Sequence, residues 1–250
     1  MGIPKLTKIA QPSQERHINT SLTTIVRIAL LFSLMLFTSL LFAGKRAASP
    51  DINSYFQNPN WRQWVNTFER PGREVYDKRH EIVAASGAKT GMIVADIGAG
   101  TGLFTRLFAD SVGAAGRVYA VDISRPFIEN ILRTSGEQGF VNIEGVVNSS
   151  KDVSLPTDSI DIAFLVDTYH HFEYPFSMLA SIQRALKAGG ALIIIDFRRD
   201  PHRSSKWVMQ HVRSGKDVVI DEVTQAGFHL IDDKPLLRTN YYLVFKKPDA

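Results

Sequence analysis

The run VADIGAGTG, residues 94–102, constrains the fold of this chain more than any other segment. An apolar stretch ends in an acid, and three glycines then alternate with small residues before a helical pattern begins at Leu103. Glycine lets a ligand approach the backbone without meeting a Cβ atom. In open sheets built from alternating strands and helices, such a loop lies at the carboxyl edge, where ligands bind. The run therefore predicts a strand, a ligand-binding loop and a helix.

Strand and helix patterns alternate through the rest of the chain. Apolar strand candidates lie at 92–97, 118–121, 142–147, 160–166 and 191–197, and helix candidates lie between them at 103–111, 125–134 and 175–186. A helix is expected at 217–226, followed by a strand hairpin at 229–233 and 241–245. This alternation predicts a doubly wound, Rossmann-like α/β domain with helices on both faces of a mainly parallel sheet.

The domain is expected to span residues 60–250 and to begin with a helical lid. Within residues 60–86, apolar residues including Trp61, Trp64 and Phe68 share one helical face, and Pro71-Gly72 interrupts the pattern. The polar residues 47–59 ahead of it are interpreted as a linker. The composition, 44% hydrophobic and 22% charged, is that of a globular protein.

The glycine spacing narrows the choice of ligand. In the dinucleotide fingerprint G-x-G-x-x-G the third glycine would occupy position 103, where this chain has Leu103. That difference weakens the alternative of an NAD(P)-dependent oxidoreductase. Asp122 ends the strand VYAVD, where a carboxylate can accept both hydroxyls of a ribose. A nucleoside without a pyrophosphate is therefore expected, although Asp122 could instead only cap the next helix.

Four motifs in order resemble those of class I S-adenosylmethionine-dependent methyltransferases: VADIGAGTG, VYAVD, LPTDSIDIAF and HHFEYPFSMLASIQRALKAGGALIIIDF. The resemblance covers about residues 76–245 and implies a seven-stranded sheet with an antiparallel last strand and S-adenosylmethionine as cofactor. It implies that Asp96 and the loop bind the amino-acid end of the cofactor, that Asp122 with Ile123 binds the ribose, and that Asp152 binds the adenine amine. The loop residues are Gly98, Ala99, Gly100, Thr101 and Gly102.

The methyl acceptor is expected beside the segment that follows the fourth strand. This segment supplies Asp167, Tyr169, His170 and His171 as candidates. A histidine with a near-neutral pKa could remove a proton from the acceptor, and His170 is the candidate base, with packing and positioning as its other reading. The segment lacks the Asn/Asp-Pro-Pro-aromatic run of nucleic-acid and amide methyltransferases, so a small acceptor is expected, and a membrane tether would suit a lipophilic one.

The lid, the segment 201–216 and two strand-end aspartates supply further candidates for the acceptor side and for a metal site. In the lid, Arg73, Tyr76 and Arg79 could reach the cofactor or acceptor, or form an exposed charged face. The segment 201–216 supplies a possible acceptor wall or a solvated, membrane-facing rim, with Trp207, Met209, His211 and Arg213. Asp167 and Asp196 end adjacent strands, as in magnesium-dependent catechol methyltransferases, but Phe197 stands where a third ligand would be needed. We therefore predict no metal.

The N-terminal part has a different composition from the domain. Residues 28–43 carry no charge, a run between the lengths of a signal-peptide core and a spanning helix. We predict a basic and polar tail at 1–27 and a single-pass anchor at 28–46, with a cleaved signal peptide as the alternative. Flanking basic residues mildly favour an external domain, but the methyl donor is made in the cytoplasm, so a cytoplasmic domain is expected.

The charge balance and the cysteine count exclude several classes of function. The net charge is only +4, from 29 basic and 25 acidic residues, and no nucleic-acid partner is expected. The absence of cysteine excludes disulfides and thiolate metal sites. The sequence therefore predicts a membrane-tethered methyltransferase that acts by in-line transfer, and a non-catalytic S-adenosylmethionine-binding protein is the second alternative.

Overall fold

The computed structural model describes residues 46–49 and 51–248 of the chain. The uncharged run at 28–43, expected to form the membrane anchor, lies outside the described residues. Among the helices of the described part, none is long and apolar enough to cross a membrane. The described residues belong to one structural unit.

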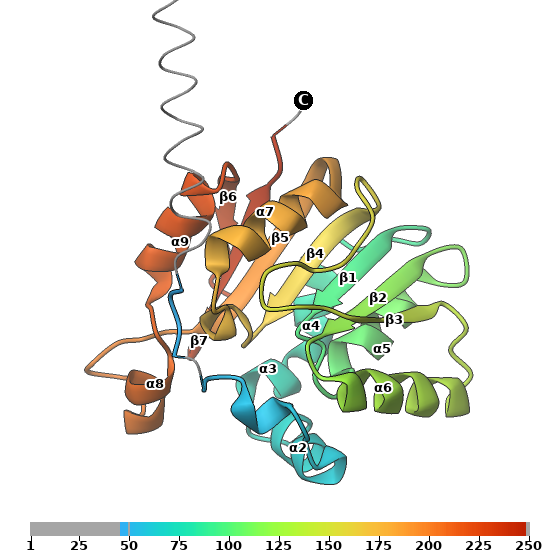
Figure 1. Cartoon of the computed structure of the whole chain (residues 1–250), viewed down its shortest axis with the longest axis horizontal. Coiled ribbons are helices and arrows are strands. Elements are labelled where there is room, and N and C mark those ends of the chain that lie inside the picture. Colours follow the sequence, from blue (N-terminus) through green and yellow to red (C-terminus); the bar gives the residue numbers. More distant parts are fainter. Residues whose placement is uncertain (1–45, 50, 249–250) are drawn as a thin grey trace, which may run out of the picture. The chain divides into compact units, whose positions relative to one another are not determined.

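Seven strands form one sheet in the order β3-β2-β1-β4-β5-β7-β6 (Figure 1). Their bounds are β1 Ile93–Ile97, β2 Arg117–Asp122, β3 Ile143–Val147, β4 Ile160–Val166, β5 Leu186–Phe197, β6 His229–Asp233 and β7 Asn240–Lys246. The pairs among β1 to β5 are parallel, and β7 runs antiparallel to both β5 and β6. The predicted seven-stranded α/β sheet with its antiparallel last strand is confirmed.

Helices cover both faces of this sheet. Alternate residues of each central strand enter separate hydrophobic clusters, because successive side chains of a strand point to opposite faces. One cluster packs against α4 (Arg79–Ala85) and α5 (Leu103–Val112), with α6 (Arg125–Glu137) beside them. The other packs against α7 (Pro175–Ala185) and α9 (Lys216–Gln225). Burial on both faces explains why these strands are almost uninterrupted apolar runs.

The predicted lid consists of separate short helices. Helix α2 (Trp61–Phe68) begins at Asn60, whose side chain accepts a hydrogen bond from the Gln63 amide at 3.3 Å. The Pro71-Gly72 turn, with Gly72 at φ +86°, ends this segment, and α3 (Glu74–Asp77) follows before α4. These elements, coloured cyan in Figure 1, lie below the carboxyl ends of the strands.

The segment predicted as a linker is packed against the domain instead. The Ala47 amide donates to the Glu173 carbonyl at 2.7 Å, and Arg46 forms an ion pair with the Glu173 carboxylate at 2.5 Å. The short 3₁₀-helix η1 (Ser54–Phe56) follows, and the Asn53 side chain donates to the His171 carbonyl at 3.2 Å. These partners lie more than a hundred residues later in the chain, so the local composition of the segment could not indicate its contacts with the domain.

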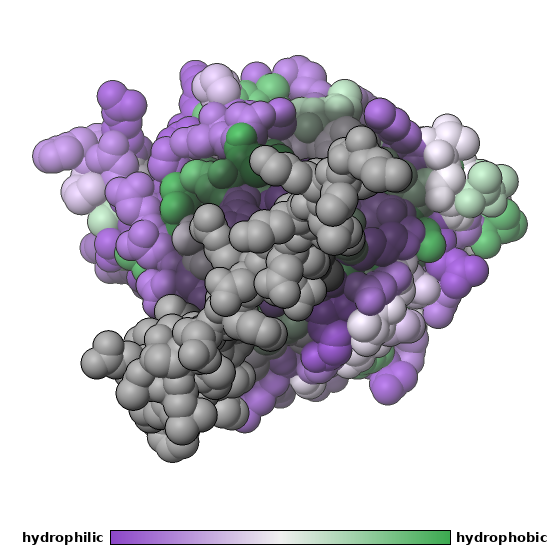
Figure 2. Space-filling model, turned by 90° about the horizontal axis from the view of Figure 1, so that it is seen from above, coloured by the Kyte–Doolittle hydropathy of each residue, from purple (hydrophilic) through white to green (hydrophobic). Residues whose placement is uncertain are grey.

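The face of the molecule seen in Figure 2 is mostly hydrophilic where described residues are visible, with hydrophobic residues in small separate groups. Single exposed apolar residues of this kind are normal for a globular protein. A cavity of the described part has a mainly apolar lining.

Candidate functional site

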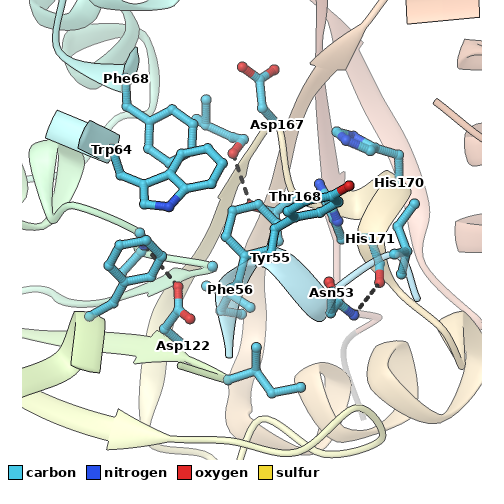
Figure 3. Close-up of a pocket in the computed structure, with 18 of the residues that line it drawn as sticks. Asn53, Tyr55, Phe56, Trp64, Phe68, Asp122, Asp167, Thr168, His170 and His171 are labelled. Atoms are coloured by element: carbon cyan, nitrogen blue, oxygen red, sulfur yellow. Dashed lines mark hydrogen bonds between the residues drawn. The ribbon is translucent and has the colours of Figure 1, made fainter. Parts of the chain in front are cut away.

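A cavity of about 840 Å³ lies at the carboxyl edge of the sheet, where the strand order reverses between β1 and β4. Its walls come from the glycine loop, η1, α2, the segment after β4, and α8 (Lys206–His211). In Figure 3, Trp64 and Phe68 lie on one side of this space and His170 and His171 on the other. The volume and the mainly apolar lining suit a small-molecule site.

The glycine loop needs its glycines for two different reasons. Gly98 has φ +75°, and a Cβ atom there would lie 2.3 Å from the Thr168 side chain. Gly100 has φ +53°, and a Cβ there would meet only the Phe68 ring at 3.5 Å. Gly98 therefore allows the loop to pack against the end of β4, whereas Gly100 keeps the backbone bare toward the cavity. Gly98, Ala99, Gly100 and Thr101 line the cavity.

Gly102 does not line the cavity. It has φ +77°, and a Cβ there would lie 2.8 Å from Ile131 of α6. Its role is to let the loop turn into α5 beside α6. Leu103, which stands where the dinucleotide fingerprint would have its third glycine, does line the cavity.

Asp122 ties the glycine loop to the end of β2. One carboxylate oxygen accepts a hydrogen bond from the Gly100 amide at 2.9 Å, and the other accepts one from the Ser124 amide at 2.8 Å. Burial raises the pKa of Asp122 to about 6. Each carboxylate oxygen can accept a second hydrogen bond, so the two hydroxyls of a ribose can still bind. Asp122 and the predicted Ile123 both line the cavity.

Asp96 is the next-to-last residue of β1 and precedes the same loop. Its carboxylate is 3% exposed and accepts a hydrogen bond from the Thr105 hydroxyl at 2.6 Å. Burial raises the pKa of Asp96 to about 7. A buried carboxylate of this kind suits a cationic partner such as an ammonium group, because pairing relieves the cost of burying its charge.

Besides Gly102, three other predicted site residues do not line the cavity. Asp152 accepts from the Ser154 amide and pairs with Arg184 at 2.7 Å, so the adenine assignment is not supported by its position. The nearby Asn148, Ser149 and Ser150 line the cavity instead. Tyr76 lies under the Arg79 guanidinium, 4.3 Å from the ring centre, and both residues lie outside the cavity lining.

Tyr169 is the third of these residues. Tyr169 was predicted to be a catalytic group in the cavity, but its ring is fully buried in the core. Its hydroxyl donates to the Glu222 carboxylate of α9 at 2.8 Å. In the 3₁₀-helix η2 (Tyr169–His171), Tyr169 enters the core, while the two following histidines line the cavity.

Asp167 lines the cavity, and each of its oxygens already accepts one hydrogen bond. One accepts from Arg73 of the lid at 2.6 Å, and the other from the Asn240 side chain of β7 at 2.6 Å. Its backbone has φ +50°, which turns the chain out of β4. Asp167 therefore joins three elements and is placed to hold the lid, with Arg73 reaching the cavity wall as well.

His170 has the geometry of an oriented imidazole. Its Nδ1 lies 2.8 Å from an oxygen of Asp196, and the other Asp196 oxygen accepts from the His170 amide at 3.0 Å. Burial disfavours the charged ring, but the Asp196 carboxylate outweighs burial and raises the pKa of His170. With Nδ1–H directed at Asp196, the lone pair lies on Nε2. This Nε2 is buried without a hydrogen-bond partner among the described residues, and His170 lines the cavity.

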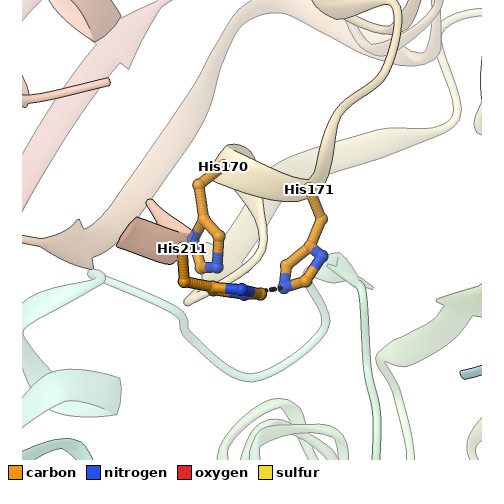
Figure 4. Close-up of side chains that lie close together, drawn as sticks. All are labelled: His170, His171 and His211. Carbon is orange, nitrogen blue, oxygen red and sulfur yellow. Dashed lines mark hydrogen bonds between the residues drawn. The ribbon is translucent and has the colours of Figure 1, made fainter. Parts of the chain in front are cut away.

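Two more histidine rings lie beside His170 (Figure 4). The Nε2 atoms of His171 and His211 are 3.4 Å apart, and His211 of α8 stacks on Trp207 with ring centres 4.5 Å apart. Burial, with His170 and His211 nearby, lowers the pKa of His171 to about 3. The sequence places His211 in the acceptor wall, but this cluster was not predicted, because α8 approaches η2 only in the folded chain.

The comparisons with known proteins agree with this geometry. Residues 95–194 match the methyltransferase domain family. The chain is 32% identical over 123 residues to a ubiquinone/menaquinone biosynthesis C-methyltransferase, UbiE, from Marinomonas sp. (strain MWYL1), and 28% identical over 123 residues to the one from Hydrogenovibrio crunogenus. The matches cover 49% of this chain and 49% and 48% of those enzymes, so the chain aligns with about half of each relative.

Solved structures share the fold over a longer stretch. A SAM-dependent methyltransferase from Aquifex aeolicus has a TM-score of 0.67 at 22% identity and covers 76% of this chain and 99% of its own. The [4+2]-cyclase SpnF has a TM-score of 0.62 at 14% identity and covers 91% of this chain and 96% of its own. Likeness at these identities concerns the fold, which can host different reactions. Residues 95–194 are thus a methyltransferase domain, and the four motifs, the bare loop and the fold around it are those of class I S-adenosylmethionine-dependent methyltransferases.

Proposed function

We propose that this chain transfers a methyl group from S-adenosylmethionine to a small, mainly apolar acceptor held in the cavity beside His170. The observation that carries the proposal is the unpartnered His170 Nε2, which shares one cavity with the bare glycine loop, Asp96 and Asp122. A cofactor site and an oriented imidazole in one cavity are what methyl transfer to an acceptor that must lose a proton requires.

The cofactor is proposed to lie along the loop. Its ammonium group would pair with Asp96, and its carboxylate would lie near the amides at the start of α5, where the helix dipole favours negative charge. Its ribose would bind to Asp122, and its adenine would lie beside Ile123, Phe127 and Ser149, which line the cavity. The sulfonium would then face the opposite wall, where the acceptor binds.

The transfer is an in-line displacement in this proposal. The acceptor atom attacks the methyl carbon, and the carbon–sulfur bond breaks with its electron pair going to sulfur, which leaves S-adenosylhomocysteine. The proton of the acceptor goes to His170 Nε2, and Asp196 stabilises the imidazolium that forms. The sulfonium supplies the driving force, so the protein contributes alignment and exclusion of water.

The acceptor is proposed to be an aromatic compound with an ionisable hydroxyl, such as a hydroquinone. Aromatic side chains of the cavity wall include Phe56, Trp64, Phe68, Phe197 and Trp207. Such walls favour flat apolar molecules. The similarity to enzymes named as ubiquinone/menaquinone C-methyltransferases supports the same class of acceptor. Ionising a hydroxyl of such a ring makes a ring carbon nucleophilic, and after methyl transfer the hydrogen of that carbon moves as a proton to the oxygen, which restores the aromatic hydroxyl.

The N-terminal segment fits a membrane-dissolved acceptor. We propose that residues 28–46 anchor the chain and that the domain faces the cytoplasm, where the methyl donor is made. The support is the uncharged run at 28–43. An alkaline carbonate wash of membranes that carry the full chain tests whether residues 28–46 anchor it. Protease treatment of sealed spheroplasts tests on which side of the membrane the domain lies. Release by the wash, or digestion of the domain from outside, would count against the respective proposal.

The activity is tested by transfer of a labelled methyl group from S-adenosylmethionine to hydroquinones and other phenols in detergent. Wild type is expected to methylate at least one of them. His170→Ala is expected to lower turnover by about 10²–10⁴-fold, the contribution of general-base catalysis, with cofactor affinity within about twofold of wild type. Cofactor binding without transfer to any hydroquinone or phenol would contradict the proposal and favour the non-catalytic alternative.

A further inference from the structure

The three histidines at the acceptor end of the cavity have an arrangement that proton transfer by His170 alone does not explain. We propose that His170, His171 and His211 together bind one divalent transition-metal ion of the zinc class, with an open coordination position toward the cavity. The ion would be held from two elements, η2 and α8, that are about forty residues apart in the chain.

The spacing of the nitrogen atoms carries the first step. One ligand nitrogen from each ring lies within 4.8 Å of the other two. Tetrahedral zinc with bonds of about 2.0–2.1 Å places neighbouring nitrogens about 3.3 Å apart. The Nε2 atoms of His171 and His211, at 3.4 Å, already have that separation. Rotation of the side chains would bring the third nitrogen to the same separation, so that three imidazole nitrogens surround one ion.

The environment of His170 carries the second step. Its Nδ1 is held by the buried Asp196 carboxylate, and its Nε2 is buried without a partner among the described residues. Metal-bound histidines almost always donate their other ring N–H to a carboxylate, a carbonyl or water, which orients the ring and strengthens the ligand. A bound cation would satisfy the Nε2 lone pair, which is otherwise a buried and unmatched polar atom.

The nature of the ligands selects the class of metal. Imidazole nitrogen suits Zn²⁺, Cu²⁺ and Ni²⁺, whereas Mg²⁺ prefers oxygen ligands. The two strand-end aspartates considered for Mg²⁺ have other partners, since Asp167 pairs with Arg73 and accepts from Asn240, and Asp196 holds the His170 ring. Three protein ligands and an open position form the arrangement of catalytic rather than structural zinc sites.

The ion has a consequence for the acceptor, and this consequence rests on the proposed function. A metal on His170 Nε2 and a proton on the same atom exclude each other. In the metal-loaded protein the hydroxyl of the acceptor would bind to the open position as an oxygen anion, and its proton would leave to water. The ion would thereby do the work that His170 does as a base in the metal-free protein.

The test is metal binding by the full chain, purified in detergent and stripped with a chelator. Titration with Zn²⁺ followed by calorimetry, and with Co²⁺ followed by visible absorption, is expected to show one ion per chain and the intense bands of tetrahedral Co²⁺. His211→Ala and His171→Ala are expected to weaken binding at least tenfold, and Asp196→Asn about 10–100-fold. His229→Ala, at an exposed residue of β6, is the matched control and should bind as wild type does.

Two results would overturn the metal proposal. One is no binding by folded wild type, and the other is equal affinity in His211→Ala and His229→Ala, which would place the ion elsewhere in the chain. Should His211→Ala unfold, His211→Gln, with its fold checked by circular dichroism, replaces it. Metal binding without methyl transfer would contradict only the proposed function, and transfer by a chain that binds no metal would contradict only the metal site.

Discussion

Asp96 is a carboxylate that the fold keeps almost out of contact with water. Burial raises its pKa to about 7, so below that pH the empty site holds a neutral acid. A cationic ammonium group favours the ionised form, so binding the cofactor must displace a proton when the site is protonated. The cost of this step falls as the pH rises through the pKa and disappears above it.

Cofactor affinity is therefore expected to increase from about pH 5.5 to about pH 7.5, with proton release on binding in the lower part of that range. Calorimetry in two buffers of different ionisation enthalpy measures both quantities. Asp96→Asn should bind more weakly and lose most of this pH dependence, while the part due to Asp122, whose pKa is raised to about 6, remains. An unchanged pH profile in Asp96→Asn would remove Asp96 from the cofactor site.

Individual side-chain directions were the hardest feature to predict. Tyr169 and His170 are neighbours in a segment that was expected to face the cavity, yet Tyr169 is in the core and His170 is in the cavity wall. The direction follows from the turn at Asp167, whose φ of +50° has no signature in the sequence. Asp152 likewise has a partner, Arg184, that only the packing of α7 beside it reveals.

At the scale of elements, the contact between the glycine loop and the end of β4 sets the shape of the cavity. A methyl group at Gly98 would lie 2.3 Å from the Thr168 side chain, whereas one at Gly100 would meet only a ring at ordinary distance. Both residues have positive φ, so both substitutions also carry a backbone cost of about 1–2 kcal/mol. The difference between the two isolates the packing of loop against strand.

Gly98→Ala is expected to lower the free energy of unfolding by about 1–3 kcal/mol more than Gly100→Ala, because only the first overpacks the contact. Urea unfolding followed by circular dichroism measures both variants under the same conditions. Adding Thr168→Gly to Gly98→Ala should recover part of the loss. Equal destabilisation by the two alanine variants would show that the glycine loop is not tightly packed against the end of β4.

Elements were predictable where a local pattern determines them. The central strands are buried on both faces, and their uninterrupted apolar runs locate β1 and β4 nearly at their observed positions. For β5 the run locates the end, but the strand begins at Leu186, five residues before the predicted start. The interruption at Pro71-Gly72 likewise locates the break in the lid. Residues 46–59 lack such a pattern, because they are held by partners such as Glu173 and His171 far along the chain.

At the scale of the whole molecule, cofactor and acceptor sites are assembled from distant parts around one cavity. The strands provide the loop and Asp122, the lid provides an aromatic wall, and η2 with α8 provides the histidines. Order among these parts is maintained by Arg73 with Asp167 and by Arg106 with Glu69, which tie the lid to β4 and to α5. The cofactor half of the cavity could be predicted from the sequence motifs. The acceptor half could not, because it depends on tertiary contacts that no short motif encodes.

The central claim, that this cavity binds S-adenosylmethionine through Asp122, is tested most directly by calorimetry of the full chain with that compound and with S-adenosylhomocysteine. Wild type is expected to bind both at one site, and Asp122→Ala to bind at least about tenfold more weakly, since hydrogen bonds to a charged group contribute about 1.5–3 kcal/mol. Glu144→Ala, at an exposed carboxylate of the edge strand β3, should bind as wild type does. No heat with either compound, or equal affinity in Asp122→Ala and wild type, would contradict the claim.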